Sequence, residues 1–431
     1  MTGELGVAAE VRSRLEEGES AVTEFLSESL RIPSVTGDEG AYAEFLERWA
    51  RTRGWQVERL RLDDPELAGL AGLENEENPK GRWNLLLRPW PRSARPLLVV
   101  NGHLDVVPPG EPESWTGGAF DGRTEDGWVH GRGAVDTKGP IAAALLGVCA
   151  LAEMHRRPAV DVEFHLVLGE ERSGIGTRAA LESWQSPDGV VVLEPSGSLL
   201  VSASTGLIAF EVVVHGISAH TSKPWEGRDA LLHLLRIHES LSRREAEKNA
   251  AARSGDFAEV PIPAPFVIGT IEAGRFRNAV PDRAAMVGRL GLLPGESPQD
   301  AASALTALVQ RIDEEAGWLS ATEVTVFHGL AGWRTDQRDP LVAAMRSAVE
   351  SLGRDGEPRV LTAGSDAGYY GELGIPTVLF GPGEMALAHS PDERIEVTEV
   401  IASAAIIAGT VAAMPGGAAR ESPRASKEPG S

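Results

Sequence analysis

The chain has 431 residues, of which 42% are hydrophobic and 24% charged, so a disordered or fibrous class is excluded and a globular protein is expected. This length exceeds one ordinary hydrophobic core and predicts two domains. With 41 basic and 63 acidic residues, the formal net charge of -22 would repel a phosphate backbone, which argues against a nucleic-acid partner.

The start of the chain and its single cysteine bear on the compartment. The first six residues carry neither the basic nor the apolar region of a secretory signal, and no window approaches the roughly 18 uninterrupted apolar residues of a membrane span. Cys149 lies in an apolar run, where we expect a buried structural thiol. We therefore expect a cytoplasmic protein without membrane association.

The first half of the chain alternates helical and strand patterns. Apolar residues at helical spacing predict helices over 7–30 and 138–155. Short apolar runs predict strands at 84–87, 97–100, 162–168 and 190–193. This alternation indicates an α/β domain with a mostly parallel sheet and helices on both faces.

After Gly206 the pattern changes. Strand, helix, strand, strand, helix and strand are predicted in turn at 208–214, 229–245, 266–271, 284–293, 297–316 and 323–327. That order matches a ferredoxin-like α+β unit, which we place at 207–329.

The α/β pattern resumes with a strand at 377–380 and a helix at 397–413. We therefore predict one domain built from 1–206 and 330–414 and interrupted by the insert. The stretch 415–431 is rich in Gly, Pro, Ser and charge, and is predicted to be a disordered tail.

Histidines and carboxylates follow the ends of the predicted strands, where α/β sheets bind ligands. His103 and Asp105 follow the strand at 97–100, and their spacing points both side chains the same way in extended chain. An aspartate so placed can accept the second imidazole N–H and fix the tautomer of a metal-bound histidine. An ordinary histidine–aspartate pair in a loop is the alternative.

Three more carboxylate positions fit the same scheme. Asp136 falls at the entry to a helix, where it either caps free N–H groups or bridges two metals, and the local sequence does not separate the two. Glu170 and Glu171 follow the strand at 162–168, and adjacent acids project to different sides, so one can bind a metal while the other contacts an activated water. Surface acids opening a helix are the alternative.

Glu194 and His389 each follow a further apolar strand. With the positions above, they give a mixed nitrogen and oxygen ligand set suited to two zinc ions. In the insert, His220 could donate a hydrogen bond to an oxyanion, and Asn278 and Arg289 could hold a substrate carboxylate. Ordinary exposed polarity is the alternative for these three.

Six segments in order resemble the peptidase family of aminoacylase-1, acetylornithine deacetylase, succinyl-diaminopimelate desuccinylase and carboxypeptidase G. They are His-Leu-Asp at 103–105, Gly-Arg-Gly-Ala-Val-Asp-Thr-Lys-Gly at 131–139, Gly-Glu-Glu at 169–171, Leu-Glu-Pro at 193–195, Ala-His-Thr-Ser at 219–222 and His-Ser-Pro-Asp-Glu at 389–393. The resemblance covers nearly the whole chain and implies two divalent metal ions, with zinc expected first and cobalt or manganese as alternatives.

The same resemblance implies a role for each position. Asp136 would bridge the metals, with His103 and Glu194 completing one site and Glu171 and His389 the other. Glu170 would be the general base, and Asp105 would orient His103.

The insert resembles the family's lid and dimerisation domain, in which the equivalent of His220 reaches the partner subunit's site. The segment Gly-Ser-Asp-Ala at 364–367 resembles a substrate-lining loop, and Gly364 and Ser365 are its expected substrate-binding residues. A homodimer through 207–329 is therefore expected.

The predicted function is a metal-dependent amidohydrolase that cleaves a carboxylate-bearing amide through a water activated by two metal ions. Glutamate at position 194, as in the deacylase and carboxypeptidase-like members, favours an N-acyl amino acid. The alternatives are a metallo-dipeptidase or carboxypeptidase, and an amide-forming biosynthetic enzyme. A non-catalytic binding protein would be expected to lack a ligand or the base, and every one of these residues is present.

Overall fold

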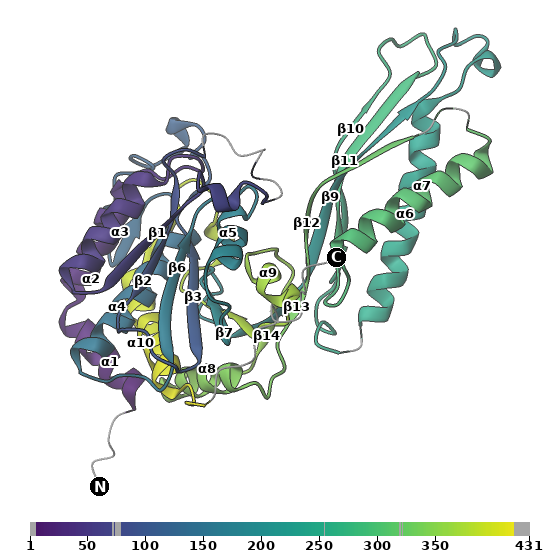
Figure 1. Cartoon of the computed structure of the whole chain (residues 1–431). Helices are drawn as coiled ribbons and strands as arrows, with labels where there is room; N and C mark the ends of the chain where they lie inside the picture. Colours follow the sequence, from purple (N-terminus) through teal and green to yellow (C-terminus); the bar gives the residue numbers. More distant parts are fainter. Residues whose placement is uncertain are drawn as a thin grey trace. The chain divides into compact units, whose positions relative to one another are not determined.

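The computed structural model describes residues 6–417, except 71, 72, 74–78, 254, 319 and 321 (Figure 1). The chain forms two compact units. Unit 1 comprises 1–202, 335–359 and 365–431, and unit 2 comprises 203–334 and 360–364. The sequence placed the insert at 207–329, just inside these bounds, and did not assign 360–364 to it. Most of the tail predicted at 415–431 lies outside the described residues.

Unit 1 is built on a mixed sheet that begins in the order β1-β2-β6-β3-β7-β15-β8. Its strands are β1 (Gln56–Arg61), β2 (Trp83–Arg88), β3 (Leu97–His103), β6 (Asp161–Val167), β7 (Gly189–Val192), β8 (Val201–Ser204) and β15 (Thr377–Leu379). The four strands β6, β3, β7 and β15 are parallel, whereas β2 runs antiparallel to β6 and β1 antiparallel to β2. The predicted α/β fold is confirmed, with its parallel part at the centre of the sheet.

Helices cover both faces of this sheet (Figure 1). Those of unit 1 are α1 (Val7–Glu17), α2 (Glu19–Arg31), α3 (Gly40–Thr52), α4 (Gly139–Glu153), α5 (Ile175–Ser183), α8 (Pro340–Ser351), α9 (Ala367–Glu372) and α10 (Val397–Ala413). Successive residues of β2 point to opposite faces: Leu85 and Leu87 pack in the core with α4 and α10, and Leu86 packs in a second core with α5. Burial on both sides explains why the central strands are rich in apolar residues.

Three short strands form a separate sheet in the order β16-β5-β4. They are β4 (Arg123–Glu125), β5 (Trp128–His130) and β16 (Arg394–Glu396), and none of them was predicted. Two further short strands, β13 (Trp333–Arg334) and β14 (Arg359–Leu361), pair with β8 of the large sheet. β16 begins only five positions after His389, so this small sheet helps to fix the course of the chain there.

The helix predicted over 7–30 is wrong as a single element. Gly18 separates α1 from α2, and its backbone (φ -104°, ψ 22°) leaves the helical region. The hydrophobic spacing continues across the break because both helices face the same core. Periodicity alone therefore could not show the break.

One helical stretch, 134–153, is long and apolar enough to cross a membrane by length and composition. Its apolar window is 94% buried inside the protein. Since α4 packs against α10 in the main core, its composition is that of a helix buried on all sides.

Unit 2 is an antiparallel four-stranded sheet in the order β10-β11-β9-β12, with two helices on one face (Figure 1). Its elements are β9 (Gly206–His215), α6 (Ala230–Ala252), β10 (Phe266–Ala273), β11 (Arg283–Leu292), α7 (Pro298–Ala316) and β12 (Glu323–Leu330). This is the ferredoxin-like order that the sequence predicted. Alternate residues of β9, such as Phe210 and Val212, are buried beneath the helices.

Candidate metal centre

The residues singled out in unit 1 lie at the carboxyl ends of its parallel strands. His103 is the last residue of β3, the pair Glu170 and Glu171 follows β6, and Glu194 follows β7. Asp136 lies in the turn that precedes α4. Since parallel strands end at one edge of a sheet, segments distant in sequence meet there.

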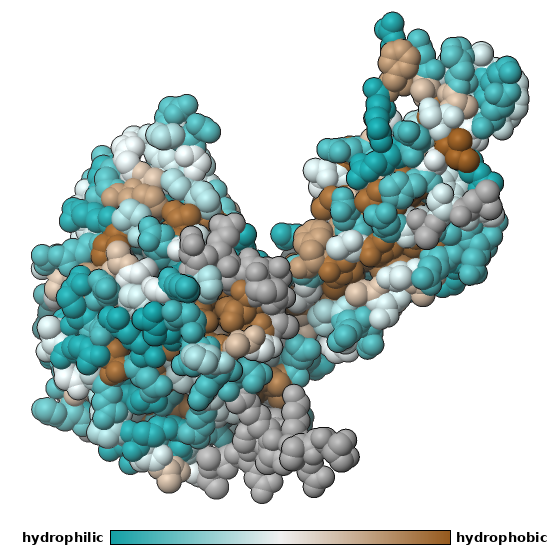
Figure 2. All heavy atoms as spheres, turned by 45° about the horizontal axis from the view of Figure 1, so that its top comes forward, coloured by the Kyte–Doolittle hydropathy of each residue, from teal (hydrophilic) through white to brown (hydrophobic). Residues whose placement is uncertain are grey.

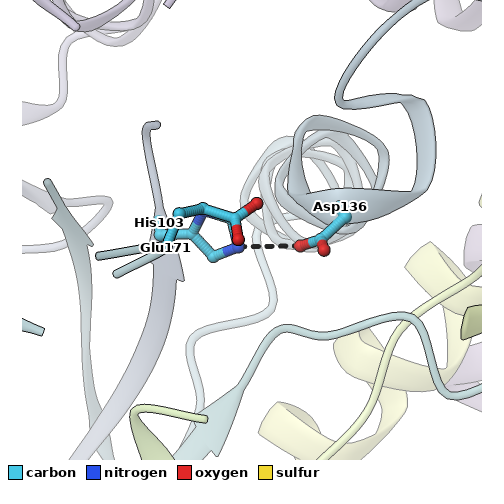
Figure 3. A group of neighbouring side chains, drawn as sticks. All are labelled: His103, Asp136 and Glu171. Atoms are coloured by element: carbon cyan, nitrogen blue, oxygen red, sulfur yellow. Dashed lines mark hydrogen bonds and ion pairs between the residues drawn. The ribbon is translucent and has the colours of Figure 1, made fainter. Parts of the chain in front are cut away.

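Asp136 lies between two histidines. Its Oδ1 is 2.9 Å from Nε2 of His103, and its Oδ2 is 3.1 Å from Nε2 of His389 (Figure 3 shows the first contact). One oxygen therefore faces each imidazole, which is the arrangement a bridging carboxylate needs. The aspartate does not cap α4, because no side-chain cap bond is formed there.

Glu171 completes a close cluster on the His389 side. Its carboxylate is 3.1 Å from Nε2 of His389, and potential ligand atoms of His103, Asp136 and Glu171 lie within 4.8 Å of one another (Figure 3). Glu194 is only 6% exposed. Burial, followed by the nearby Asp136 carboxylate, raises its pKa well above the ordinary value.

The negative charge of these carboxylates raises the pKa of both histidines. Hydrogen bonds to Asp136 and Glu171 raise the pKa of His389 to about 10. Burial would lower the pKa of His103, but the hydrogen bond to Asp136 and the negative charges of the surrounding carboxylates together outweigh it and raise the pKa. Burial would likewise raise the pKa of Asp136, and the two histidine hydrogen bonds lower it instead. The cluster therefore favours positive charge placed among its carboxylates.

Asp105 holds the turn that carries the two glutamates. Its Oδ1 accepts the Glu170 N–H at 3.1 Å, and its Oδ2 accepts the Glu171 N–H at 3.2 Å and the hydroxyl of Thr36 at 2.9 Å. Nδ1 of His103 lies 2.8 Å from the main-chain carbonyl of Asp105 and 3.8 Å from its carboxylate. The carbonyl thus fixes the imidazole, with Nε2 facing Asp136.

Glu170 is the first glutamate of the pair that follows β6. Burial, followed by the carboxylate of Glu194, raises its pKa well above the ordinary value. A carboxyl group with a raised pKa can accept a proton and release it again near neutral pH, as a general base must.

Two neighbouring residues of the 364–366 loop present buried polar atoms to this region. Ser365 Oγ and Asp366 Oδ1 have no hydrogen-bond partner among the described residues, and both side chains are at most 4% exposed. Thr177 donates to the other Asp366 oxygen at 2.6 Å, and burial raises the pKa of Asp366 to about 6. Asp366 belongs to the segment 364–367, which the resemblance identifies as a substrate-lining loop.

The residues predicted in the insert belong to unit 2 and are exposed. His220 Nδ1 accepts the N–H of Ser222 at 3.1 Å, which leaves Nε2 protonated and available to donate. Asn278 is in the turn before β11, and its carbonyl accepts the N–H of Thr221. Arg289 is on β11, on the face that the two helices leave open.

The donor set fits divalent metal ions. Imidazole nitrogen and carboxylate oxygen are ligands that zinc, cobalt and manganese accept, and a carboxylate between two histidines can serve two ions. The carboxylates around the two histidines raise the pKa of both, and this electrostatic setting favours bound cations. His103, Asp136 and Glu194 could hold one ion, and Asp136, Glu171 and His389 the other.

A family comparison decides the class of protein. Residues 99–413 match the model of peptidase family M20/M25/M40, which is well over half of the chain. The chain belongs to peptidase family M20/M25/M40. It is therefore a metal-dependent hydrolase of amide bonds.

Members of the M20 family with curated names align over most of the chain. A probable carboxypeptidase of Aspergillus clavatus is 26% identical over 390 residues, covering 88% of this chain and 86% of that protein. Succinyl-diaminopimelate desuccinylase of Methylorubrum extorquens is 28% identical over 389 residues, covering 86% and 93%.

Solved structures of the M20 family share the fold. A tripeptidase from Staphylococcus aureus superposes with a TM-score of 0.71 at 20% identity, covering 92% of this chain and 98% of that one. The metallo-carboxypeptidase of Sulfolobus solfataricus superposes with a TM-score of 0.67 at 19% identity, covering 90% and 97%. These likenesses confirm the α/β fold and, at such identity, nothing finer.

Proposed function

We propose that this M20 protein is a dinuclear zinc amidohydrolase that removes the acyl group from an N-acyl amino acid or a similar carboxylate-bearing amide. The observation that carries the proposal is the Asp136 carboxylate, which turns one oxygen to His103 and the other to His389. A carboxylate so shared is suited to two ions side by side rather than to one. Cobalt or manganese are the alternatives to zinc.

Each residue of the centre has a proposed task. When bound, the two ions lower the pKa of a water molecule and polarise the scissile carbonyl. Glu170 takes the proton of that water on its carboxylate and passes it to the leaving nitrogen. Asp105 keeps Glu170 in place through the hydrogen bond from the Glu170 N–H. His220 donates from Nε2 to the developing oxyanion.

The substrate class rests on groups that can hold a carboxylate. Arg289 offers a planar fork of donors on β11, and Asn278, in the turn before β11, offers a neutral donor. Ser365 presents a buried hydroxyl without a partner among the described residues. One curated relative is named a probable carboxypeptidase and the other a succinyl-diaminopimelate desuccinylase, which supports a carboxylate-bearing amide as the substrate. A carboxypeptidase or dipeptidase is the second candidate, and the proposed location is cytoplasmic.

The test combines metal analysis with a substrate panel. We expect about two zinc, cobalt or manganese ions per chain, and hydrolysis of N-acyl amino acids that a chelator abolishes and metal restores. Elemental analysis of purified protein and amine release from N-acyl amino acids and dipeptides measure both. Preference for dipeptides would select the second candidate. Metal-free protein that stays inactive after zinc or cobalt addition would contradict the proposal.

A homodimer through unit 2 is proposed on its exposed apolar surface. Most large hydrophobic side chains that are exposed belong to this unit, and Figure 2 shows apolar side chains gathered on it. They are Ile217, Trp225, Leu232, Leu235, Ile262, Val267, Ile271, Phe276 and Phe327. β10 is also an edge strand, which leaves backbone groups open to pairing. Such a surface on one unit favours burial against a second copy.

We propose further that His220 serves the metal centre of the partner subunit, and subunit complementation tests this. Glu170→Gln and His220→Ala chains are each expected to be nearly inactive. Co-expressed at equal levels, they should recover about a quarter of wild-type activity, because half of the dimers are mixed and each carries one intact site. Differently tagged chains allow the mixed dimer to be purified and assayed. An inactive mixed dimer, or a monomer by light scattering, would refute action across the dimer.

A further inference from the structure

Glu393 is a buried carboxylate that binds the turn carrying Asp136. It is 0% exposed. Its Oε1 accepts the N–H of Val135 at 2.8 Å and of Asp136 at 3.2 Å. Its Oε2 accepts the N–H of Gly133 at 3.0 Å and the guanidinium of Arg132 at 2.7 Å. Four donors thus converge on one side chain.

These bonds fix the backbone rather than a neighbouring side chain. A buried carboxylate is stable only when its charge is met by donors, and here three of the four are main-chain N–H groups. The direction of the Asp136 side chain depends on this backbone. Movement of the turn would shift both oxygens of Asp136 relative to His103 and His389.

Further hydrogen bonds fix the segment 389–393. The guanidinium of Arg132 donates to the carbonyl of Ser390 at 3.2 Å. Thr116 donates to the carboxylate of Asp392 through its N–H at 2.7 Å and its hydroxyl at 2.9 Å. Glu393 therefore joins the turn before α4 to the segment that carries His389.

This segment needs such support because its backbone is unfavourable. His389 has φ of 58° and Asp392 has φ of 56°, a region that costs free energy for residues other than glycine. Conformations of this kind persist where surrounding contacts fix them. His389 is half exposed, so packing of its own side chain does little to hold it.

We propose that Glu393 is a positioning residue that sets the spacing between Asp136 and His389, and so the affinity for the metal pair. It touches neither substrate nor reacting atoms. The inference rests on the proposed ligand set, and it assigns to one buried side chain the alignment of ligands from two distant segments. Residues that orient metal ligands commonly change metal affinity about 10-fold to 100-fold when replaced.

The test is the metal affinity of Glu393→Gln in the full chain, stripped of metal and titrated with zinc against a chromophoric chelator. The amide keeps one acceptor oxygen but turns an NH2 group towards donors. We expect binding about 10-fold to 100-fold weaker than wild type, with turnover partly restored by excess metal. A merely structural role would lower the melting temperature of the metal-free protein and leave the zinc affinity unchanged.

Glu163→Gln is the matched control. Glu163 is a carboxylate of β6, 2% exposed, held by Arg88 at 2.7 Å and close to His165 at 3.3 Å. Its replacement should reduce stability without changing zinc affinity. Glu393→Asp covers the case in which the glutamine variant does not fold. Aspartate keeps the negative charge but is too short to reach the three main-chain N–H groups that donate to Glu393.

Zinc binding by the wild-type chain distinguishes failure of the Glu393 proposal from failure of the dinuclear proposal. If the wild-type chain takes up two ions and a folded Glu393→Gln or Glu393→Asp chain binds them equally well, the role of Glu393 is refuted and the metal centre stands. If the wild-type chain binds no metal, the dinuclear proposal itself fails.

Discussion

Replacement of Glu170 by glutamine should reduce kcat by about a hundredfold to ten-thousandfold, the usual contribution of a general base. Glutamine has nearly the same shape but cannot take a proton from water. The main-chain N–H of residue 170 would still donate to Asp105, so the turn should keep its place. Steady-state kinetics on metal-loaded protein measure the change.

Metal content and the pH profile make this result specific. Glu170 is not among the proposed ligands, so elemental analysis should find the same metal content in the variant. The wild-type rate should fall as the pH drops below the pKa of Glu170, because the base acts in its ionised form. That acidic limb should disappear from the residual activity of the variant. A metal-loaded variant with wild-type turnover would remove Glu170 from the mechanism.

Asp136→Asn is expected to remove both metal ions and to lower kcat/KM by about a thousandfold or more, since the metals contribute several kcal/mol to the barrier reduction. One oxygen of Asp136 faces each histidine, and an amide offers only one acceptor. Loss of negative charge also weakens the hold of the cluster on any cation. The metal content, measured by elemental analysis, and kcat/KM should therefore fall together.

Asp161→Asn is the control for Asp136→Asn. Asp161 is a buried aspartate at the start of β6, and it accepts the N–H of Ser93 at 2.7 Å and its hydroxyl at 2.8 Å. Its replacement should cost stability but leave metal content intact. If Asp136→Asn kept one ion per chain, half of the wild-type metal content, Asp136 would serve one metal site rather than both.

The sequence by itself determined the fold class and the individual candidates. Largely apolar runs such as 97–100 and 162–168 predicted central strands, because strands buried on both faces are rich in apolar residues. Their ends then marked His103 and Glu170, since the carboxyl edge of a parallel sheet is where ligands bind. Periodicity failed at Gly18, where two helices share one core and keep the same spacing.

Only the tertiary structure decided how these candidates meet. The local sequence allowed Asp136 to be a helix cap or a bridge, and the choice depends on His389, which is 253 positions away and 3.1 Å from its carboxylate. Glu393 and Asp366 lie in the motif segments 389–393 and 364–367, but their roles depend on donors from distant segments, Val135 and Thr177 among them. Sequence patterns report burial and local geometry, whereas a metal centre depends on distances that folding alone creates.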